Sequence, residues 1–112
     1  MNLQLNDYVM NITVVRLSER IDAVTAPALR RQLEDKLEAG ARNFVLDLSE
    51  VPFMDSAALA VMVSLLKRAR QADGDVKMVA PKLEAARRIL ELTKFDRVFD
   101  MKETPEEAVQ SF

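Results

Sequence analysis

The sequence predicts an α/β domain with a mixed, mostly parallel central sheet of about four to five strands and about four helices. Two observations support this prediction. Short runs of apolar and β-branched residues alternate along the chain with longer stretches that have helical periodicity. The chain has 112 residues, the length of one domain, and neither a linker nor an internal repeat divides it. We therefore expect residues 1–112 to form a single domain.

The first elements are two strands. Residues 11–17, NITVVRL, mix β-branched and polar residues in the alternating way that favours a strand. Residues 3–5, LQL, are expected to pair with this strand as a hairpin, with Asn6 and Asp7 in the turn.

A helix is expected at residues 25–40, TAPALRRQLEDKLEAG. Thr25 is a candidate N-cap, and the proline that follows it fits the first turn, where a missing N–H costs nothing. Gly40 supplies a C-terminal stop. Three leucines at four-residue spacing form one apolar stripe: Leu29, Leu33 and Leu37.

A buried strand and a long helix come next. Residues 43–48, NFVLDL, are apolar on both faces at their centre, which is typical of a sheet covered by other structure. Pro52 prevents a regular continuation of that strand. Residues 55–72 predict a helix that is apolar almost all round in its first half and polar in its second half. Such a helix is buried where it begins and emerges where it ends.

The last part of the chain repeats the alternation. Residues 76–80 predict a strand, 82–93 a helix, 97–101 a short strand and 104–112 a last helix, which opens with Thr104 as N-cap. The crossovers between parallel strands should be right-handed. In the helix at 82–93, the residues expected to face the core are Leu83, Ala86, Ile89 and Leu90.

The composition excludes several kinds of catalytic site. The chain has no histidine and no cysteine, which rules out the usual catalytic triads and most zinc sites. Its two glycines, Gly40 and Gly74, are far apart, so neither phosphate-cradling glycine motif is present. We therefore expect a protein that is not an enzyme and binds no cofactor and no metal.

Net charge and hydropathy limit the classes of partner that the protein can bind. The net charge of −2 and the absence of a basic stripe argue against nucleic acid as a partner. The longest apolar run, Ala57 to Val63, is far shorter than the roughly 20 residues that span a bilayer, so no direct membrane insertion is expected. The first residues, MNLQLNDYVM, lack the features of a signal peptide. Together with the missing cysteine, this favours a cytoplasmic protein.

One junction remains to be explained. Asp55 and Ser56 lie where a helix begins after a strand, the edge at which open α/β sheets bind ligands and partners. In the simpler interpretation, one of the two caps the helix, worth about 1 kcal/mol. In the other, Ser56 is phosphorylated, and the phosphate meets free N–H groups and the positive end of the helix dipole. It would add about −1.5 to −2 charges beside Asp55. Both interpretations remain open on the residues alone.

Three segments resemble a known family. The stretch VLDLSEVPFMDSAALAVMV resembles the central segment of STAS domains, in particular the single-domain anti-sigma factor antagonists. The stretch VVRLSERIDAVTAPALRRQL is similar to that family's first strand, acidic loop and first helix. The stretch GDVKMVAPKLEAARRILELTKFDRVFDMKETPEEAV is similar to its C-terminal half.

The resemblance implies a switch at Ser56. In that family a serine kinase, which is also the anti-sigma factor, phosphorylates the serine of this motif. The unmodified form binds the kinase and releases a sigma factor, so transcription is regulated. The phosphorylated form does not bind, and a cognate phosphatase restores it. The resemblance also implies a partner-binding surface, and we expect a monomer when the protein is free. The residues of that surface are Asp22, Thr25, Asp55, Ser56, Ala57 and Ala58.

The chain departs from the family at positions where glycine is frequent. Glu19, Ala58 and Ala60 stand at three of them, and a fourth lies near Lys94. Alanine is favoured over glycine in a helix by about 1 kcal/mol, but the methyl group of Ala58 would lie beside the docking surface. The departures favour an alternative, a STAS subunit of a membrane transporter that docks an ATPase subunit without phosphorylation. A small-ligand sensor is a third interpretation.

Overall fold

The computed structural model describes residues 1, 3–7 and 11–112, and in them a five-stranded sheet with four α-helices. The strands lie side by side in chain order. β1 is antiparallel to β2, and every other neighbouring pair is parallel. The predicted fold class is therefore confirmed. The elements are β1 (Gln4–Asp7), β2 (Ile12–Arg16), α1 (Ala26–Glu38), β3 (Asn43–Asp47), α2 (Ser56–Gln71), β4 (Asp75–Val79), α3 (Glu84–Leu92), the 3-10 helix η1 (Phe95–Arg97), β5 (Asp100–Lys102) and α4 (Pro105–Gln110).

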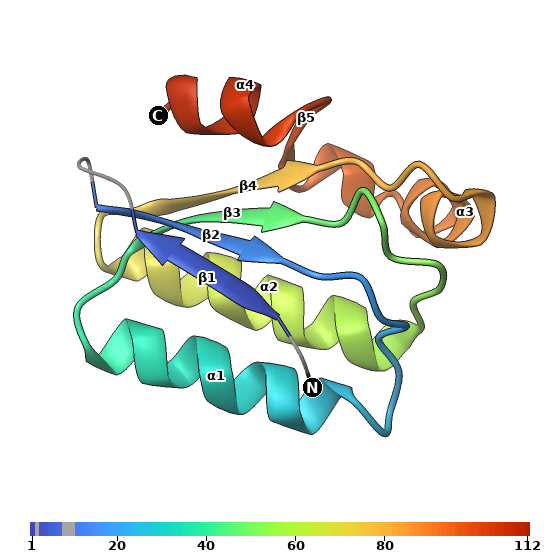
Figure 1. Cartoon of the computed structure of the whole chain (residues 1–112), viewed down its shortest axis with the longest axis horizontal. Helices are drawn as coiled ribbons and strands as arrows, with labels where there is room; N and C mark the ends of the chain where they lie inside the picture. The colour runs from blue at the N-terminus through green and yellow to red at the C-terminus, as the bar shows by residue number, and fades with distance from the viewer. Residues whose placement is uncertain (2, 8–10) are drawn as a thin grey trace.

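The two faces of the sheet are covered unequally. Figure 1 shows α1 and α2 side by side on one face, α4 on the other, and α3 beyond the end at which the parallel strands finish. α1 and α2 both begin at that same end, because each follows directly on a parallel strand. All the loops that carry the candidate site therefore gather at one edge of the sheet.

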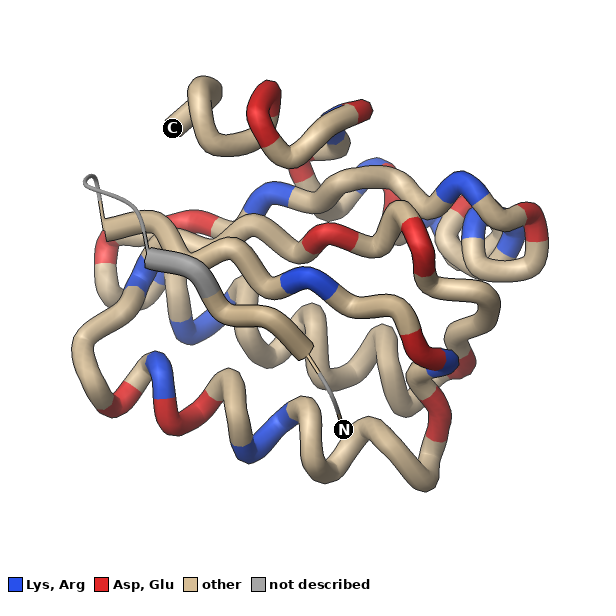
Figure 2. The backbone as a smooth tube through the Cα atoms, viewed as in Figure 1, with Lys and Arg blue, Asp and Glu red and all other residues tan. Residues whose placement is uncertain are grey.

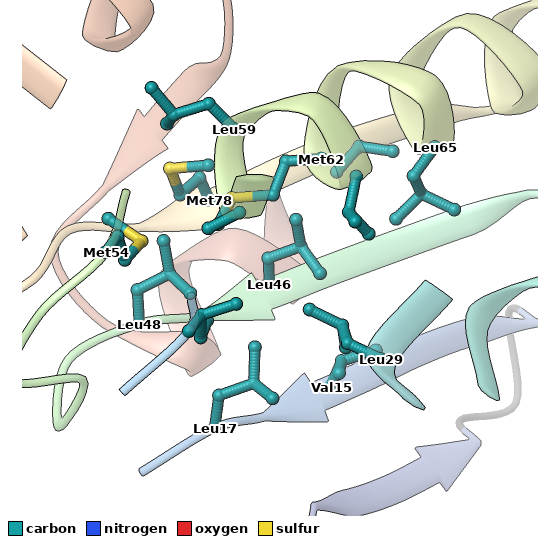
Figure 3. Packing of buried hydrophobic residues seen from close by; sticks show 14 of the residues in the cluster. Val15, Leu17, Leu29, Leu46, Leu48, Met54, Leu59, Met62, Leu65 and Met78 are labelled. Atoms are coloured by element: carbon teal, nitrogen blue, oxygen red, sulfur yellow. The ribbon is translucent and has the colours of Figure 1, made fainter. Parts of the chain in front are cut away.

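The main core lies between the sheet and α2. Leu46 of β3 is fully buried and points toward Met62 of α2 (Figure 3). Burying a side chain of this size stabilises the fold by roughly 1.5–3 kcal/mol. α1 contributes two fully buried leucines to the same cluster, Leu29 and Leu33, as its leucine stripe predicts. The buried first half of α2 fixes the position of its N-terminus, where Ser56 lies.

A smaller core lies under α4. Val45 on the opposite face of β3 is fully buried and packs with Val79 and Ala108. Beside them, the Nζ atom of Lys77 donates to Oδ2 of Asp100 at 2.6 Å and lies 4.9 Å from the ring centroid of Phe112. The burial of β3 on both faces confirms the interpretation of its apolar sequence.

Several expected boundaries are corrected by the structure. Asn6 and Asp7 belong to β1 rather than to a turn, because β1 continues its pairing with β2 through Asp7; the connection itself falls outside the described residues. The short strand expected at 97–101 lies at Asp100–Lys102, because η1 occupies the residues before it. Leu83 does not face the core: it precedes α3 and is 46% exposed.

Two further observations concern membranes and metals. Among the residues that the structure describes, no helix combines the length and the hydropathy that crossing a bilayer requires. In the same residues, acidic side chains do not gather in groups of three or more that could hold a metal ion.

Candidate functional site

The candidate site begins with two loops that are bonded to each other. The β2–α1 loop and the β3–α2 loop meet at Ile21: its N–H donates to the carbonyl of Phe53 at 3.0 Å, and its carbonyl accepts from the N–H of Asp55 at 3.2 Å. Ile21 and Met54 form a parallel β-bridge, and both side chains are fully buried. These contacts bring the loop of Asp22 next to the loop of Asp55, so the residues predicted from distant parts of the sequence share one edge.

Asp55 is the N-cap of α2. Its backbone is extended, and its Oδ1 atom accepts from the N–H of Ala57 at 2.8 Å and from the N–H of Ala58 at 3.4 Å. A cap of this kind stabilises a helix by about 1 kcal/mol. The capping interpretation of the junction is confirmed for Asp55. The expectation that a phosphate would find these N–H groups free is wrong, because the carboxylate already occupies two of them.

The side chain of Ser56 makes no contribution to the helix cap or to the core. It is the first residue of α2, its side chain is exposed, and its hydroxyl makes no hydrogen bond to any described residue. Helix capping is done by its neighbour. An exposed hydroxyl held at the start of a rigid helix is accessible to a modifying enzyme and to a binding partner.

Asp22 and Thr25 hold the other loop through reciprocal hydrogen bonds. The N–H of Asp22 donates to Oγ1 of Thr25 at 3.0 Å, and the N–H of Thr25 donates to Oδ1 of Asp22 at 3.2 Å. Oγ1 of Thr25 donates in turn to the carbonyl of Arg20 at 3.0 Å. Thr25 is the N-cap residue of α1, as predicted, but its side chain makes no capping hydrogen bond to the helix, because its hydroxyl is used within the loop.

The carboxylate of Asp22 is stabilised in its charged form. The backbone N–H of Thr25 lowers its pKa most, and the N–H of Val24 and the guanidinium of Arg20 add to this against the opposing effect of burial. Nε of Arg20 lies 2.9 Å from Oδ2 of Asp22. The negative charge of Asp22 is therefore a fixed feature of this edge.

The two alanines that follow Ser56 differ in position. Ala57 is half-buried, whereas the side chain of Ala58 is fully buried in the main core. The prediction that Ala58 contacts a partner is wrong, because every third or fourth residue of α2 must face the sheet. Ala60, at another position where the family often has glycine, is exposed.

Sequence reasoning missed the apolar residues of this edge. The guanidinium of Arg20 lies 5.2 Å from the ring centroid of Phe53, and that ring is 38% exposed. Phe53 also lines a groove with Ile89 and Leu92 of α3, and Leu92 is 73% exposed. On the other side of the edge, Val24 is 85% exposed. The sequence offers one signal, a phenylalanine in a loop directly before the Asp55-Ser56 pair.

The fold and this edge define a small α/β domain in which helix N-termini and acidic loops lie at one end of the sheet. Residues 6–108 match the model of the STAS domain. The chain belongs to the STAS domain family.

Relatives in this family carry related names. The chain is 30% identical over 96 residues to the anti-sigma-B factor antagonist of Bacillus subtilis, with 86% of each chain covered. It superposes with a TM-score of 0.86 on the crystal structure of an anti-sigma factor antagonist from Mycobacterium paratuberculosis, at 28% identity over 98% of this chain and 92% of that one. The phosphorylated form of the Bacillus cell fate determinant SpoIIAA has the same fold, with a TM-score of 0.75 at 18% identity and 98% of each chain covered.

Proposed function

We propose that this protein is an anti-sigma factor antagonist whose binding is switched at Ser56. With Ser56 unmodified, it binds a serine kinase that is also an anti-sigma factor; with Ser56 phosphorylated, it releases that partner, and a cognate phosphatase restores binding. The observation that supports this most strongly is the exposed hydroxyl of Ser56, which has no partner among the described residues and lies beside a charged cap.

The switch is electrostatic. Oδ1 of Asp55 already accepts hydrogen bonds from the N–H groups of Ala57 and Ala58. These two donors are therefore not available to a phosphate on Ser56, which stays hydrated. It remains on the outer surface and adds about −1.5 to −2 charges next to a carboxylate. A partner surface that accommodates a neutral hydroxyl would have to bury this charge unpaired, which is costly.

The partner surface includes the fixed edge around Ser56. We assign to it Asp22, Thr25, Asp55, Ser56 and Ala57, with the exposed ring of Phe53 as an apolar anchor between the two loops. Apolar anchors surrounded by polar groups are typical of protein interfaces. The protein acts by binding rather than by catalysis, in the cytoplasm, and is a monomer when free.

Relatives support the proposal from outside the chain. One relative is named as an antagonist of anti-sigma-B factor, and SpoIIAA is known in an unphosphorylated and a phosphorylated form with this fold. These statements concern those proteins. Their bearing on this chain rests on the Asp55-Ser56 pair that begins α2 here.

The test is a pull-down from native lysate with four baits: wild type, Ser56→Ala, Ser56→Asp and, as a matched control, Ser111→Asp at the exposed end of the chain. We expect an ATP-binding serine kinase on every bait except Ser56→Asp. Purified kinase should phosphorylate wild type and the control but not Ser56→Ala. If all four baits hold the same transporter ATPase, the switch is refuted and the protein is a fixed docking subunit.

A further inference from the structure

A second surface lies on the outside of the two helices that cover the sheet. Three adjoining hollows follow the line between α1 and α2 and continue along α2. We call this surface the basic groove. It is defined by Arg30 and Arg31 of α1 and by Ala57, Ala60, Ser64, Lys67 and Arg68 of α2.

The floor of the basic groove is smooth. Ala57, Ala60 and Ser64 follow one another at spacings of three and four residues, so they lie on one face of α2. Their small side chains leave room for the backbone of another element to come close, as in helix packing where ridges fit between small residues. From Ala57 to Arg68 the face is about 16 Å long, at 1.5 Å per residue, or about three helical turns.

The walls of the basic groove carry cations without partners. Within the described residues, Arg30, Arg31, Lys67 and Arg68 form no ion pair, whereas Arg70, Arg87 and Arg88 each pair with a carboxylate. The one carboxylate that lines the groove is Glu34. The surface is therefore positive on a chain whose net charge is −2. Figure 2 shows Lys and Arg on the second half of α2, charges of both signs on α1, and no charged residue on the first half of α2.

We propose that the basic groove binds an acidic α-helix of a protein partner. Carboxylates spaced three or four residues apart on that helix would face the two pairs of cations, one pair on each helix, while its small apolar residues would lie on Ala57 and Ala60. A nucleic-acid strand fits less well: the floor offers methyl groups and no aromatic ring for base stacking. The inference goes beyond the proposed function and does not depend on phosphorylation of Ser56.

The test uses the full ¹⁵N-labelled chain and a synthetic capped peptide of about four helical turns, with glutamates at spacings of three and four among alanine and leucine. A second peptide has lysine in place of every glutamate. We expect amide shifts from the acidic peptide to concentrate on the residues of the basic groove. Arg30→Glu with Arg31→Glu should weaken binding about tenfold, because like charges then face each other.

Two comparisons decide the outcome. Lys82→Glu with Arg97→Glu makes the same charge change at two exposed positions outside the groove and should leave the affinity within about twofold. Lys67→Glu with Arg68→Glu changes the two cations on α2 and should weaken binding of the acidic peptide by a similar factor. Circular dichroism checks that each variant is folded. The proposal would be overturned if the control pair weakened binding as much as the groove variants did, or if the lysine peptide bound as tightly as the acidic one. It would also be overturned if a short single-stranded oligonucleotide bound more tightly through the same residues. Since no kinase is present, this test and that of the Ser56 switch succeed or fail separately.

Discussion

Lys94 has a backbone conformation that glycine adopts more easily. Its φ angle of 62° is in the left-handed region, directly before η1. For an L-residue this region costs roughly 1–2 kcal/mol, which glycine does not pay. Glycine also loses more conformational freedom on folding, and this offsets roughly half of the stability gained by removing the strain. We expect Lys94→Gly to raise the free energy of unfolding by up to about 1 kcal/mol, measured by urea denaturation. Lys94→Ala keeps the strain and should bring no gain, so equal stability of the two variants would show that the φ angle is not the cause.

Asp55 and Ser56 divide two tasks between neighbouring positions. Asp55→Ala removes the acceptor for two N–H groups of α2 and should lower the free energy of unfolding by about 1 kcal/mol. Ser56→Ala should change it by less than about 0.5 kcal/mol, because the hydroxyl is exposed and has no partner in the described part of the chain. Chemical denaturation of both variants tests this division. A loss on Ser56→Ala as large as that on Asp55→Ala would mean that the serine is a structural residue.

The sequence allowed the junction at residue 55 to be found but not all of its neighbours. A carboxylate between a strand and an apolar helix predicts a cap, and Asp55 is one. Thr25 is the N-cap of α1, as predicted, but the hydrogen bonds of its hydroxyl within the loop depend on geometry that the sequence does not show. Ala58 was misplaced because helical periodicity turns its side chain toward the core. Phe53 was missed because its exposure depends on how two distant loops meet at Ile21.

At the scale of elements, a charge pair between Lys77 of β4 and Asp100 of β5 joins these two neighbouring strands of the sheet. The hydrogen bond from Lys77 lowers the pKa of Asp100 most, and the charges of Lys77 and Lys102 add to this, while burial opposes it. The folded pKa is below the ordinary value of 3.8, so the contribution to stability is present above that pH and is lost as the pH falls through the folded pKa.

Asp100 should therefore contribute to the way the free energy of unfolding depends on pH. We expect Asp100→Asn to be less stable than wild type near neutral pH and to lose less stability on acidification below about pH 4. Urea denaturation at a series of pH values, with Asp96→Asn as a control from the neighbouring η1, measures the difference. Parallel curves for wild type and Asp100→Asn would show that the pair with Lys77 does not titrate in this way.

Most elements could be predicted because hydrophobic periodicity is strong in α1, β3 and α2, where the spacing of buried residues matches the sequence pattern. The region after β4 was harder. Leu83 was assigned to the core because it fits the apolar pattern of α3, yet it lies before the helix begins and is exposed. The residues of η1 and β5 contain no periodic signal, and their conformation follows from contacts with α3 and β4.

In the whole molecule, β3 is the central strand of the sheet. The free energy of local opening should be highest there and should decrease toward both edges of the sheet. β3 pairs with a strand on each side and is covered on both faces, whereas β1 and β5 have a single neighbour each among the described strands. We expect the amides of β3 and the buried first half of α2 to exchange with solvent most slowly, near the rate set by global unfolding. Native-state hydrogen exchange measures this. Slower exchange in β5 than in β3 would contradict it.

The order of the strands has a consequence for how the chain is made. Because the strands stand in the sheet in the order in which they occur in the sequence, each new strand joins the free edge left by the one before it. No late segment has to be inserted between two that have already paired. A chain leaving the ribosome can therefore complete the hairpin, then β3 with α1, then β4 with α2, burying each helix as soon as the next strand has formed. The two loops that carry Asp22 and Ser56 precede β4 in the chain, so the elements that hold them can pair before β5 and α4 are added.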